Sequence, residues 1–277
     1  MADIRIGLSG WRYAGWRGDF YPKGLVQRKE LAYAAERFST IEVNGSFYSL
    51  QRPASYATWR DETPDDFVFA LKGGRFITHM KRLRDVDGAM ANFFASGPLA
   101  LGDKLGPVLW QLPARTRFDA DVLDAFLERL PRTSGEAADL ACHHDAKLPA
   151  DRALTTALTQ VRLRHAIEPR DLSFADPAAI DLLRRHDVGL VVSDAGDKWP
   201  RFEEVTSDLV YVRLHGAEEL YTSGYGPQAL DEWAARISSW AGQGLDVLVY
   251  FDNDAKVHAP YDALALMDRL GLRSPLA

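Results

Sequence analysis

Residues 209–216 read LVYVRLHG and have the two-residue periodicity of a β-strand. One face of this strand is apolar and consists of Val210, Val212 and Leu214. The other face is polar and consists of Tyr211, Arg213 and His215. Removing the partner of a buried charge costs about 3–5 kcal/mol, so a strand that buries an arginine needs acidic neighbours or a polar site beside it. We therefore expect this strand to border a polar interior enclosed by a sheet.

Seven other stretches of the chain also have sequence patterns typical of β-strands. With 209–216, the predicted strands are Ile4 to Ser9, Thr40 to Asn44, Phe67 to Lys72, Gly106 to Leu112, Arg164 to Glu168, Gly189 to Val192 and Val247 to Phe251. Helical patterns separate them, and this alternation over 277 residues predicts an α/β fold with a single TIM-type (β/α)8 barrel covering residues 1–277. Residues 131–163 fit the alternation least, so we expect an irregular or helical insertion between the fourth and fifth strands, with a helical stretch near 151–161.

The composition excludes several classes of protein. Hydrophobic residues make up 47% and charged residues 26% of the chain, which is typical of a globular protein, and the net charge of −6 gives no overall attraction to nucleic acid or anionic membranes. The single cysteine, Cys142, excludes an internal disulfide and a metal cluster held by several cysteines. No GxGxxG follows the first strand, and no GxxxxGK[ST] occurs. No leader-like start and no run of about 18 apolar residues is found, so we expect a cytoplasmic protein without a membrane partner, and the oligomeric state stays open.

Active sites of such barrels form at the carboxyl ends of the strands. Ionisable or amide side chains occur at nearly all of these ends: Ser9 and Trp11, Glu42 and Asn44, Lys72 with Arg75 and His79, Gln111, Glu168 and Arg170, Ser193 and Asp194, Arg213 and His215, and 252–254. The pattern predicts a ligand site at this rim. Aromatic residues of the following loops either stack on a ligand ring or plug the barrel mouth: Trp11, Tyr13, Trp16, Tyr21, Phe47 and Tyr48.

Several of these residues also have a purely structural interpretation. Glu42 can pair with Lys72 or Arg213 to neutralise the barrel interior, and either histidine can be structural. Gly73 and Gly74 before Arg75 form either an anion-binding nest or an ordinary turn. The DND sequence at 252–254 lacks the later glycine and glutamate of a calcium loop, and adjacent residues such as His143 and His144 are poorly placed to bind one metal ion together.

Ordered sequence blocks give the chain a resemblance to the domain of unknown function family 72, also called the YecE-like family. These blocks are IGLSGW (6–11), EVNGSFY (42–48), Trp59 to Lys72, ITH (77–79), GPVLWQLP (106–113), RHAIEPR (164–170), YVRLHG (211–216) and YFDND (250–254). The resemblance covers essentially the whole chain and implies a TIM-type barrel, but no established reaction. The chain departs from the family pattern at Gly45, Phe174 and Asp252, the last standing where asparagine is common.

The resemblance implies a site made of Glu42, Asn44, Tyr48, Lys72, His79, Gln111, Glu168, Arg170, Arg213, His215 and Asn253. With the strand-end residues Trp11 and Arg75, this set predicts an enzyme, hydrolase-like, that acts on an anionic ring-bearing substrate such as a nucleotide, a nucleic-acid fragment or a sugar phosphate. Glu42, Glu168 and His215 are the predicted catalytic residues, and the remaining members bind substrate.

Two alternatives stay open. The acids and histidines could instead bind zinc, manganese or magnesium in a metal-dependent hydrolase or isomerase, although no ligand-spaced motif occurs and our principal interpretation has no cofactor. The rim could also bind a small anion or a partner without catalysis.

Overall fold

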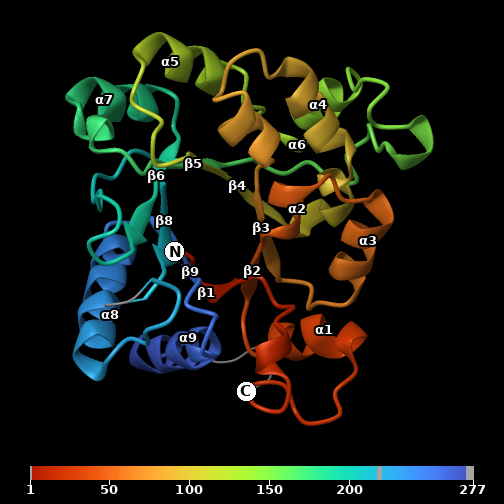
Figure 1. Cartoon of the computed structure of the whole chain (residues 1–277). Helices are drawn as coiled ribbons and strands as arrows, with labels where there is room; N and C mark the ends of the chain where they lie inside the picture. Colours follow the sequence, from red (N-terminus) through yellow and green to blue (C-terminus); the bar gives the residue numbers. More distant parts are fainter. Residues whose placement is uncertain (1, 217–219, 273–277) are drawn as a thin grey trace.

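A computed structural model describes residues 2–216 and 220–272, and its centre is a sheet of nine parallel strands (Figure 1). The strands are β1 (Ile4–Ser9), β2 (Thr40–Val43), β3 (Val68–Lys72), β4 (Leu105–Gln111), β5 (His165–Glu168), β6 (Gly189–Leu190), β7 (Val192–Asp194), β8 (Leu209–Leu214) and β9 (Asp246–Phe251). Their order in the sheet is β6-β5-β4-β3-β2-β1-β9-β8-β7.

The sheet forms a nearly closed barrel because its two ends are consecutive in the chain. Val191 alone separates β6 from β7, and its backbone N–H donates to the carbonyl of Ile167 in β5. On the other side, β8 lies next to β6, since a Cβ placed on Gly189 would lie 3.0 Å from the carbonyl oxygen of Leu209. The strands therefore enclose a common interior.

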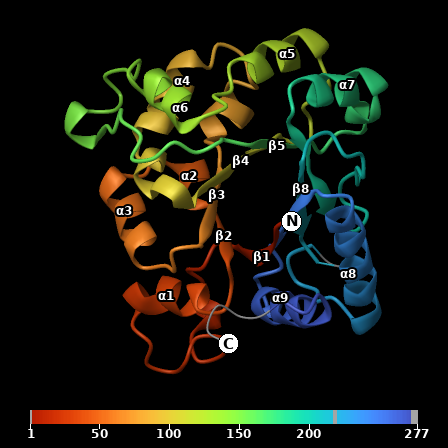
Figure 2. The same ribbon diagram turned by 180° about the vertical axis from the view of Figure 1, so that it is seen from behind.

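Helices surround the barrel on its outside (Figures 1 and 2). They are α1 (Glu30–Ala35), α2 (Gly45–Tyr48), α3 (Pro53–Asp61), α4 (Asp87–Ala95), α5 (Ala120–Glu128), α6 (Ser134–Ala141), α7 (Pro177–Arg185), α8 (Pro227–Gly242) and α9 (His258–Arg269). Shorter helical turns span Ala14–Trp16, Gln27–Lys29, Phe76–Met80, Pro98–Lys104, Ala150–Arg152 and Leu172–Ala175. Several begin as their sequences predict: Asp119 caps α5 through the backbone N–H of Val122, and Pro177 opens α7.

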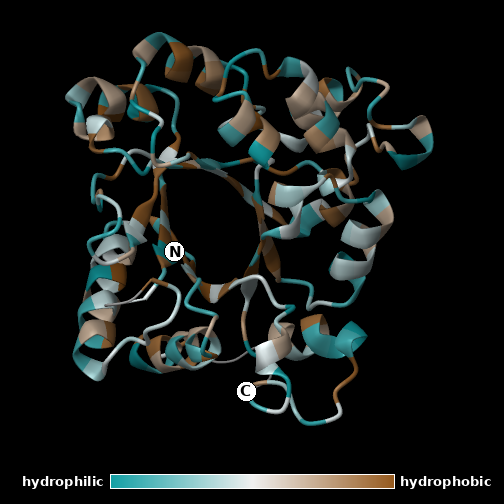
Figure 3. Ribbon diagram, viewed as in Figure 1, coloured by the Kyte–Doolittle hydropathy of each residue, from teal (hydrophilic) through white to brown (hydrophobic). Residues whose placement is uncertain are grey.

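Alternate residues of the strands point into the barrel and out toward the helices. The outward side chains belong to the main core, and the brown ribbon of the strands in Figure 3 marks their apolar character. The inward side chains form a separate apolar cluster of Ala70, Leu109, Ala166, Val191, Leu209, Tyr211, Leu248 and Tyr250. In β8 the two faces divide as the sequence predicts, because Val210, Val212 and Leu214 lie in the main core.

The strand register places polar strand ends side by side. Ser9 of β1 pairs with Glu42 of β2, and Gln111 of β4 pairs with Glu168 of β5. Ser193 of β7 is aligned with Arg213 of β8. The carboxyl ends of the strands thus bring these side chains to one level inside the barrel.

The structure differs from the sequence-based expectations in two places. The strand predicted over 189–192 is divided into β6 and β7, so the sheet has nine strands rather than eight. The helix predicted near 151–161 is wrong, since the helix between α5 and β5 is α6 at 134–141, where Thr133 caps it by accepting from the backbone N–H of Glu136. Residues 150–152 form only one 3-10 turn.

None of the helices within 2–216 and 220–272 is both long and apolar enough to cross a bilayer.

We expect Gly7→Ala to destabilise the barrel. Gly7 occupies a position of β1 that faces the barrel interior. A Cβ added there would lie 2.0 Å from the carbonyl oxygen of Thr40, so β1 and β2 would have to separate. Overpacking of this kind costs about 1–3 kcal/mol in the free energy of unfolding. Urea denaturation measures it, and Gly15→Ala is the control because a Cβ at Gly15 meets no atom within 4 Å. Equal stability of the two variants would contradict the assigned close approach.

Candidate functional site

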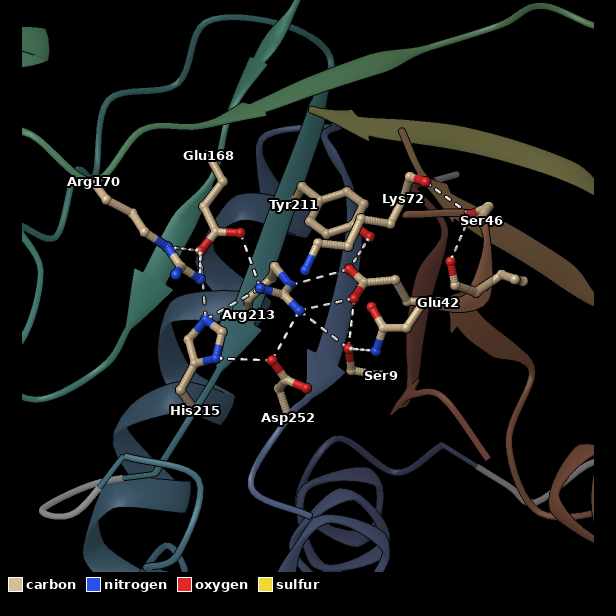
Figure 4. Close-up of polar contacts among 12 residues, drawn as sticks. Ser9, Glu42, Ser46, Lys72, Glu168, Arg170, Tyr211, Arg213, His215 and Asp252 are labelled. Carbon is tan, nitrogen blue, oxygen red and sulfur yellow. Dashed lines mark hydrogen bonds and ion pairs between the residues drawn. The ribbon is translucent and has the colours of Figure 1, made fainter. Parts of the chain in front are cut away.

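The guanidinium group of Arg213 lies at the centre of the barrel mouth, fully buried among three carboxylates (Figure 4). It donates to Glu42 through Nε (3.1 Å) and Nη2 (2.9 Å). Nη1 donates to Glu168 and Nη2 to Asp252, each at 2.9 Å. Burial alone disfavours the charge on Arg213, but the three carboxylates hold its pKa well above the usual range. Strands β2, β5, β8 and the end of β9 are therefore joined through one cation.

Glu42 is held from two further sides. Tyr211 donates its hydroxyl to Oε2 at 2.7 Å, and Ser9 donates to Oε1 at 2.5 Å. Asn44 in turn donates to Ser9 Oγ at 2.9 Å. With the bonds from Arg213, each carboxylate oxygen accepts two hydrogen bonds, so the fully buried Glu42 is completely satisfied within the protein.

Glu168 bridges Arg213 to the residues nearer the rim. Arg170 donates to Glu168 Oε1 through Nη2 at 3.1 Å and Nε at 3.3 Å. His215 lies between two carboxylates, with Nε2 3.6 Å from Glu168 Oε1 and Nδ1 3.0 Å from Asp252 Oδ2. Burial raises the pKa of Glu168, but Arg213 and Arg170 outweigh it and hold the pKa well below its usual range. Asp252 has a lowered pKa too, since Arg213 and His215 outweigh its burial.

A cavity of about 720 Å³ opens above this buried network, at the carboxyl ends of the strands. Its aromatic lining residues are Trp11, Tyr13, Phe47, Tyr48, Trp59 and Tyr221. Its ionisable lining residues include Arg12, Lys72, His79, Arg170, Asp252 and Asp254, and Asn44 and Gln111 add amide groups. The cavity thus combines ring surfaces with charged and hydrogen-bonding groups.

Three of the lining groups have shifted pKa values. Burial and the nearby Arg213 lower the pKa of Lys72 to about 8. Burial and the charge of Asp252 raise the pKa of Asp254 to about 6. Burial, followed by Lys72 and Arg170, lowers the pKa of His79 below its ordinary 6.5, so this imidazole is neutral at pH 7. Groups that change charge near neutrality are suited to proton transfer.

The structure divides the predicted site residues into three sets. Those that line the cavity are Trp11, Asn44, Tyr48, Lys72, His79, Gln111 and Arg170. Those fully buried beneath it are Glu42, Glu168, Arg213 and His215. The remaining two lie elsewhere: Arg75 lines a neighbouring groove of about 590 Å³, and Asn253 is buried, with its Nδ2 donating to the carbonyl of Ser223 and to Asp262.

Some lining residues were not among the predicted catalytic or substrate-binding residues. They include Arg12, Trp59 and Tyr221, and also Asp254, which was expected at the rim as part of 252–254 but without an assigned role. The DND sequence at 252–254 was the available signal for Asp254, because two acids separated by one residue at a strand end can face the same site. Of the six rim aromatics, Trp16 and Tyr21 are buried core residues, whereas the other four line the cavity, where stacking on a ligand ring stays a prediction.

The acidic residues considered as metal ligands lie around Arg213 instead of around an empty centre. Its guanidinium group occupies the space between Glu42, Glu168 and Asp252. Within the described part of the chain, no three His, Cys, Asp or Glu side chains are grouped so that they could hold one metal ion.

The family model described as "Protein of unknown function DUF72" matches residues 5–276. The chain belongs to the DUF72 family. The DUF72 chain is 33% identical over 132 residues to the UPF0759 protein YecE of Escherichia coli, a match that covers 46% of this chain and 44% of YecE. It is 22% identical to the UPF0759 protein YunF of Bacillus subtilis over 97% of this chain and 95% of that protein.

Two solved structures share the fold of the DUF72 chain. A DUF72 family protein from Thermotoga maritima superposes with a TM-score of 0.76 at 23% identity, covering 97% of this chain and 99% of that chain. A DUF72 family protein from Enterococcus faecalis gives 0.74 at 19% identity, covering 97% and 96%. The nearly closed barrel is therefore common to these relatives.

We expect Arg213→Met to lower the free energy of unfolding of the DUF72 chain by about 3–5 kcal/mol, because it leaves three buried carboxylates without their common partner. Arg84→Met is the matched control. Arg84 pairs with Asp119 at 2.8 Å on the surface, and such pairs contribute at most about 1 kcal/mol. Denaturant titration at pH 7 compares the two, and a loss no larger for Arg213→Met would show that its network does not stabilise the barrel.

We also expect stability to fall in acid. Glu168 and Asp252 have folded-state pKa values below their ordinary 4.5 and 3.8, so their contribution is complete above those values and is lost as the pH falls toward the folded-state values. Denaturant titrations between pH 7 and pH 3 should show a decline below about pH 4.5. Asp252→Asn should have lower stability at pH 7 and a shallower acid decline, because one of the two groups no longer titrates. If the free energy of unfolding of this variant fell with pH as steeply as that of the wild type, Asp252 would not contribute to the acid sensitivity.

Proposed function

We propose that this DUF72 chain is an enzyme that acts on an anionic, ring-bearing substrate in the cavity at the carboxyl ends of the strands. Nucleotides, nucleic-acid fragments and sugar phosphates belong to this class. The observation that carries the proposal is the make-up of the cavity lining, where Arg12, Lys72 and Arg170 lie among aromatic rings. Glu42 and Glu168 beneath the cavity, and Asp252 at its lining, are bound to Arg213, and Asp254 also lines the cavity. A phosphate group can therefore meet donors that the protein has not already paired.

The cations of the cavity support binding of an anion. The backbone carbonyl of Lys72 accepts from Ser46 Oγ, but its Nζ has no hydrogen-bond or carboxylate partner among the described residues and lies 4.7 Å from the ring centroid of Phe47. Arg170 binds Glu168 through Nε and Nη2, while its guanidinium carbon lies 3.5 Å from the ring centroid of Trp199. Arg12 is exposed at the rim. Guanidinium groups are well suited to phosphate because they donate in a planar fork.

The aromatic walls support binding of a ring. Trp11 is fixed by an edge-to-face contact with Trp59, with ring centroids 5.3 Å apart. Tyr48 is 67% exposed and packs edge-on against Phe47 at 5.0 Å. An exposed ring held by a buried one offers a flat surface for stacking with a base or sugar.

Proton transfer in the proposed reaction belongs to the groups that reach the cavity. Asp254 titrates near pH 6, and His79 is neutral at pH 7. The catalytic roles expected for Glu42, Glu168 and His215 remain predictions; because all three are fully buried, we propose that they orient Arg213 and Arg170 beneath the substrate. Hydrolysis, with Asp254 as the general base for water, is the reaction we propose.

We further propose that β6 and β7 together fill one position of a single-domain, TIM-type (β/α)8 barrel, with residues 131–163 as an insertion. A cytoplasmic location also remains a prediction. Binding of a small anion or partner without catalysis is the second function to test, and the metal-dependent reading is less favoured because Arg213 occupies the centre of the acidic cluster.

Thermal unfolding with a panel of ligands tests the proposal. We expect nucleoside monophosphates or pentose phosphates to raise Tm, whereas the matching uncharged nucleosides and sugars have little effect, because a ligand that binds only the folded state stabilises it by mass action. Mass spectrometry after long incubation separates the two functions: conversion of the ligand indicates an enzyme, and full recovery indicates a binding protein. Absence of any Tm shift across the panel would oppose both.

We expect Arg12→Ala to weaken binding of a phosphorylated ligand about tenfold, the effect of losing roughly 1.4 kcal/mol of charge-assisted contact, and to leave an uncharged analogue unaffected. Arg185→Ala is the control, because Arg185 is an exposed arginine at the end of α7, outside the cavity lining. Calorimetric titration measures both. Equal weakening by the two changes would indicate a general charge effect in place of a specific contact.

A further inference from the structure

Lys72 is a cation of the site that is both buried and without a carboxylate partner among the described residues. Lys72 ends β3 with its side chain pointing inward, and the residue is only 8% exposed. Arg213 and Arg170 are bound to carboxylates, whereas no carboxylate oxygen lies within ion-pair distance of Lys72 Nζ among the described residues. A buried amine without a counter-ion is a costly feature, since burial favours its neutral form.

The network beneath the cavity explains why Lys72 stays unpaired. Glu42 has no free hydrogen-bonding position, because both of its oxygens accept two hydrogen bonds each. Glu168 is bound by Arg213 and Arg170. Arg213 also repels a second positive charge nearby, which favours the neutral amine of Lys72 further. The arrangement places Nζ of Lys72 at the cavity without a carboxylate partner, and the lowered pKa makes its free amine accessible slightly above neutral pH.

We propose that Lys72 is a nucleophile that forms an imine with the carbonyl group of a sugar phosphate bound in this cavity. The proposal rests on the proposed function for the anionic sugar, and it narrows the substrate class to sugar phosphates that open to a free aldehyde or ketone. A desolvated lysine beside another cation is the usual way to obtain a nucleophilic amine near neutral pH.

The step balances without an oxidant or a reductant. The lone pair of Nζ attacks the carbonyl carbon, a C–N bond forms, and the carbonyl oxygen takes up a proton to give a carbinolamine. Nζ gives up a proton to a neighbouring base, and the hydroxyl oxygen takes up a second proton from an acid. The nitrogen lone pair then forms the C=N bond as the C–O bond breaks, water leaves, and a protonated imine remains. His79 and Asp254 line the same cavity, so they are the groups available to receive and return these protons. Water reverses the step and releases Lys72.

Lys104 provides a control within the same protein. It is as buried as Lys72, at 7% exposure, but its Nζ donates to the carbonyl oxygens of Arg60 (2.6 Å) and Thr63 (2.7 Å). It also donates to Thr63 Oγ1 (3.3 Å), so all three protons of the ammonium group have acceptors, which favours the protonated form, and Lys104 lies outside the cavity lining. Lys81 is the exposed control.

Reductive trapping tests the proposal. The protein is incubated with ribose 5-phosphate and sodium cyanoborohydride, digested, and mapped by mass spectrometry. We expect an adduct on Lys72, formed more than about fiftyfold faster at pH 8 than that on Lys81, because about half of Lys72 is then the free amine against under about 1% of an ordinary lysine. Lys104 should stay unlabelled. Lys72→Arg, which keeps the charge but cannot form an imine, should abolish the fast adduct, and the map of wild type decides the matter if this variant does not fold.

The outcomes separate this proposal from the proposed function. A Tm shift with ribose 5-phosphate but no adduct on Lys72 overturns the imine and leaves the function standing. A third outcome is that uncharged glycolaldehyde labels Lys72 while ribose 5-phosphate neither binds nor labels the protein. This result would support Lys72 as a nucleophile and oppose an anionic substrate. Labelling of Lys72 no faster than that of Lys81 overturns the nucleophile.

Discussion

The barrel depends on placing one guanidinium charge where water cannot reach it. Arg213 donates to carboxylates on β2, on β5 and at the end of β9, so strands far apart in sequence must meet at a single point. Pairing is obligatory because an isolated buried ion costs several kcal/mol, while exchange of the whole cluster for apolar groups would cost far less. The cluster therefore specifies how the strand ends are arranged, and it fixes the floor on which any substrate would rest.

The interior combines an apolar cluster with an ionic one. The apolar cluster contains Leu109, Leu248 and the rings of Tyr211 and Tyr250, whose centroids lie 5.0 Å apart with their planes tilted by 35°. The hydroxyl of Tyr211 then reaches Glu42, and the ionic layer begins. The protein thus surrounds its buried charge with polar partners in place of hydrocarbon, and polar groups reach the cavity at the carboxyl ends of the strands.

Much of this could be read from the sequence, because strand periodicity assigns each side chain to a face. The inward position of Arg213 and the outward position of Val212 follow from 209–216 alone. Periodicity does not show how far a side chain lies from the barrel mouth. It therefore could not predict that Lys72 lines the cavity whereas Glu42 lies beneath it. It also fails beyond a strand end, where Asn253 turns away to meet Asp262. The short interruption at Val191 and the helix at 134–141 escaped because local patterns there are weak and tertiary packing decides.

The order of strands in the sheet has a consequence for how the molecule folds. Every neighbouring pair is also adjacent in the chain except β1 and β9, whose residues are separated by more than two hundred positions. Joining them carries the largest loop-closure entropy, whereas the seam between β6 and β7 requires almost none. The pairing of β1 with β9 is also what brings Arg213 and Asp252 to Glu42. The ionic cluster is therefore complete only when the two ends of the chain have met.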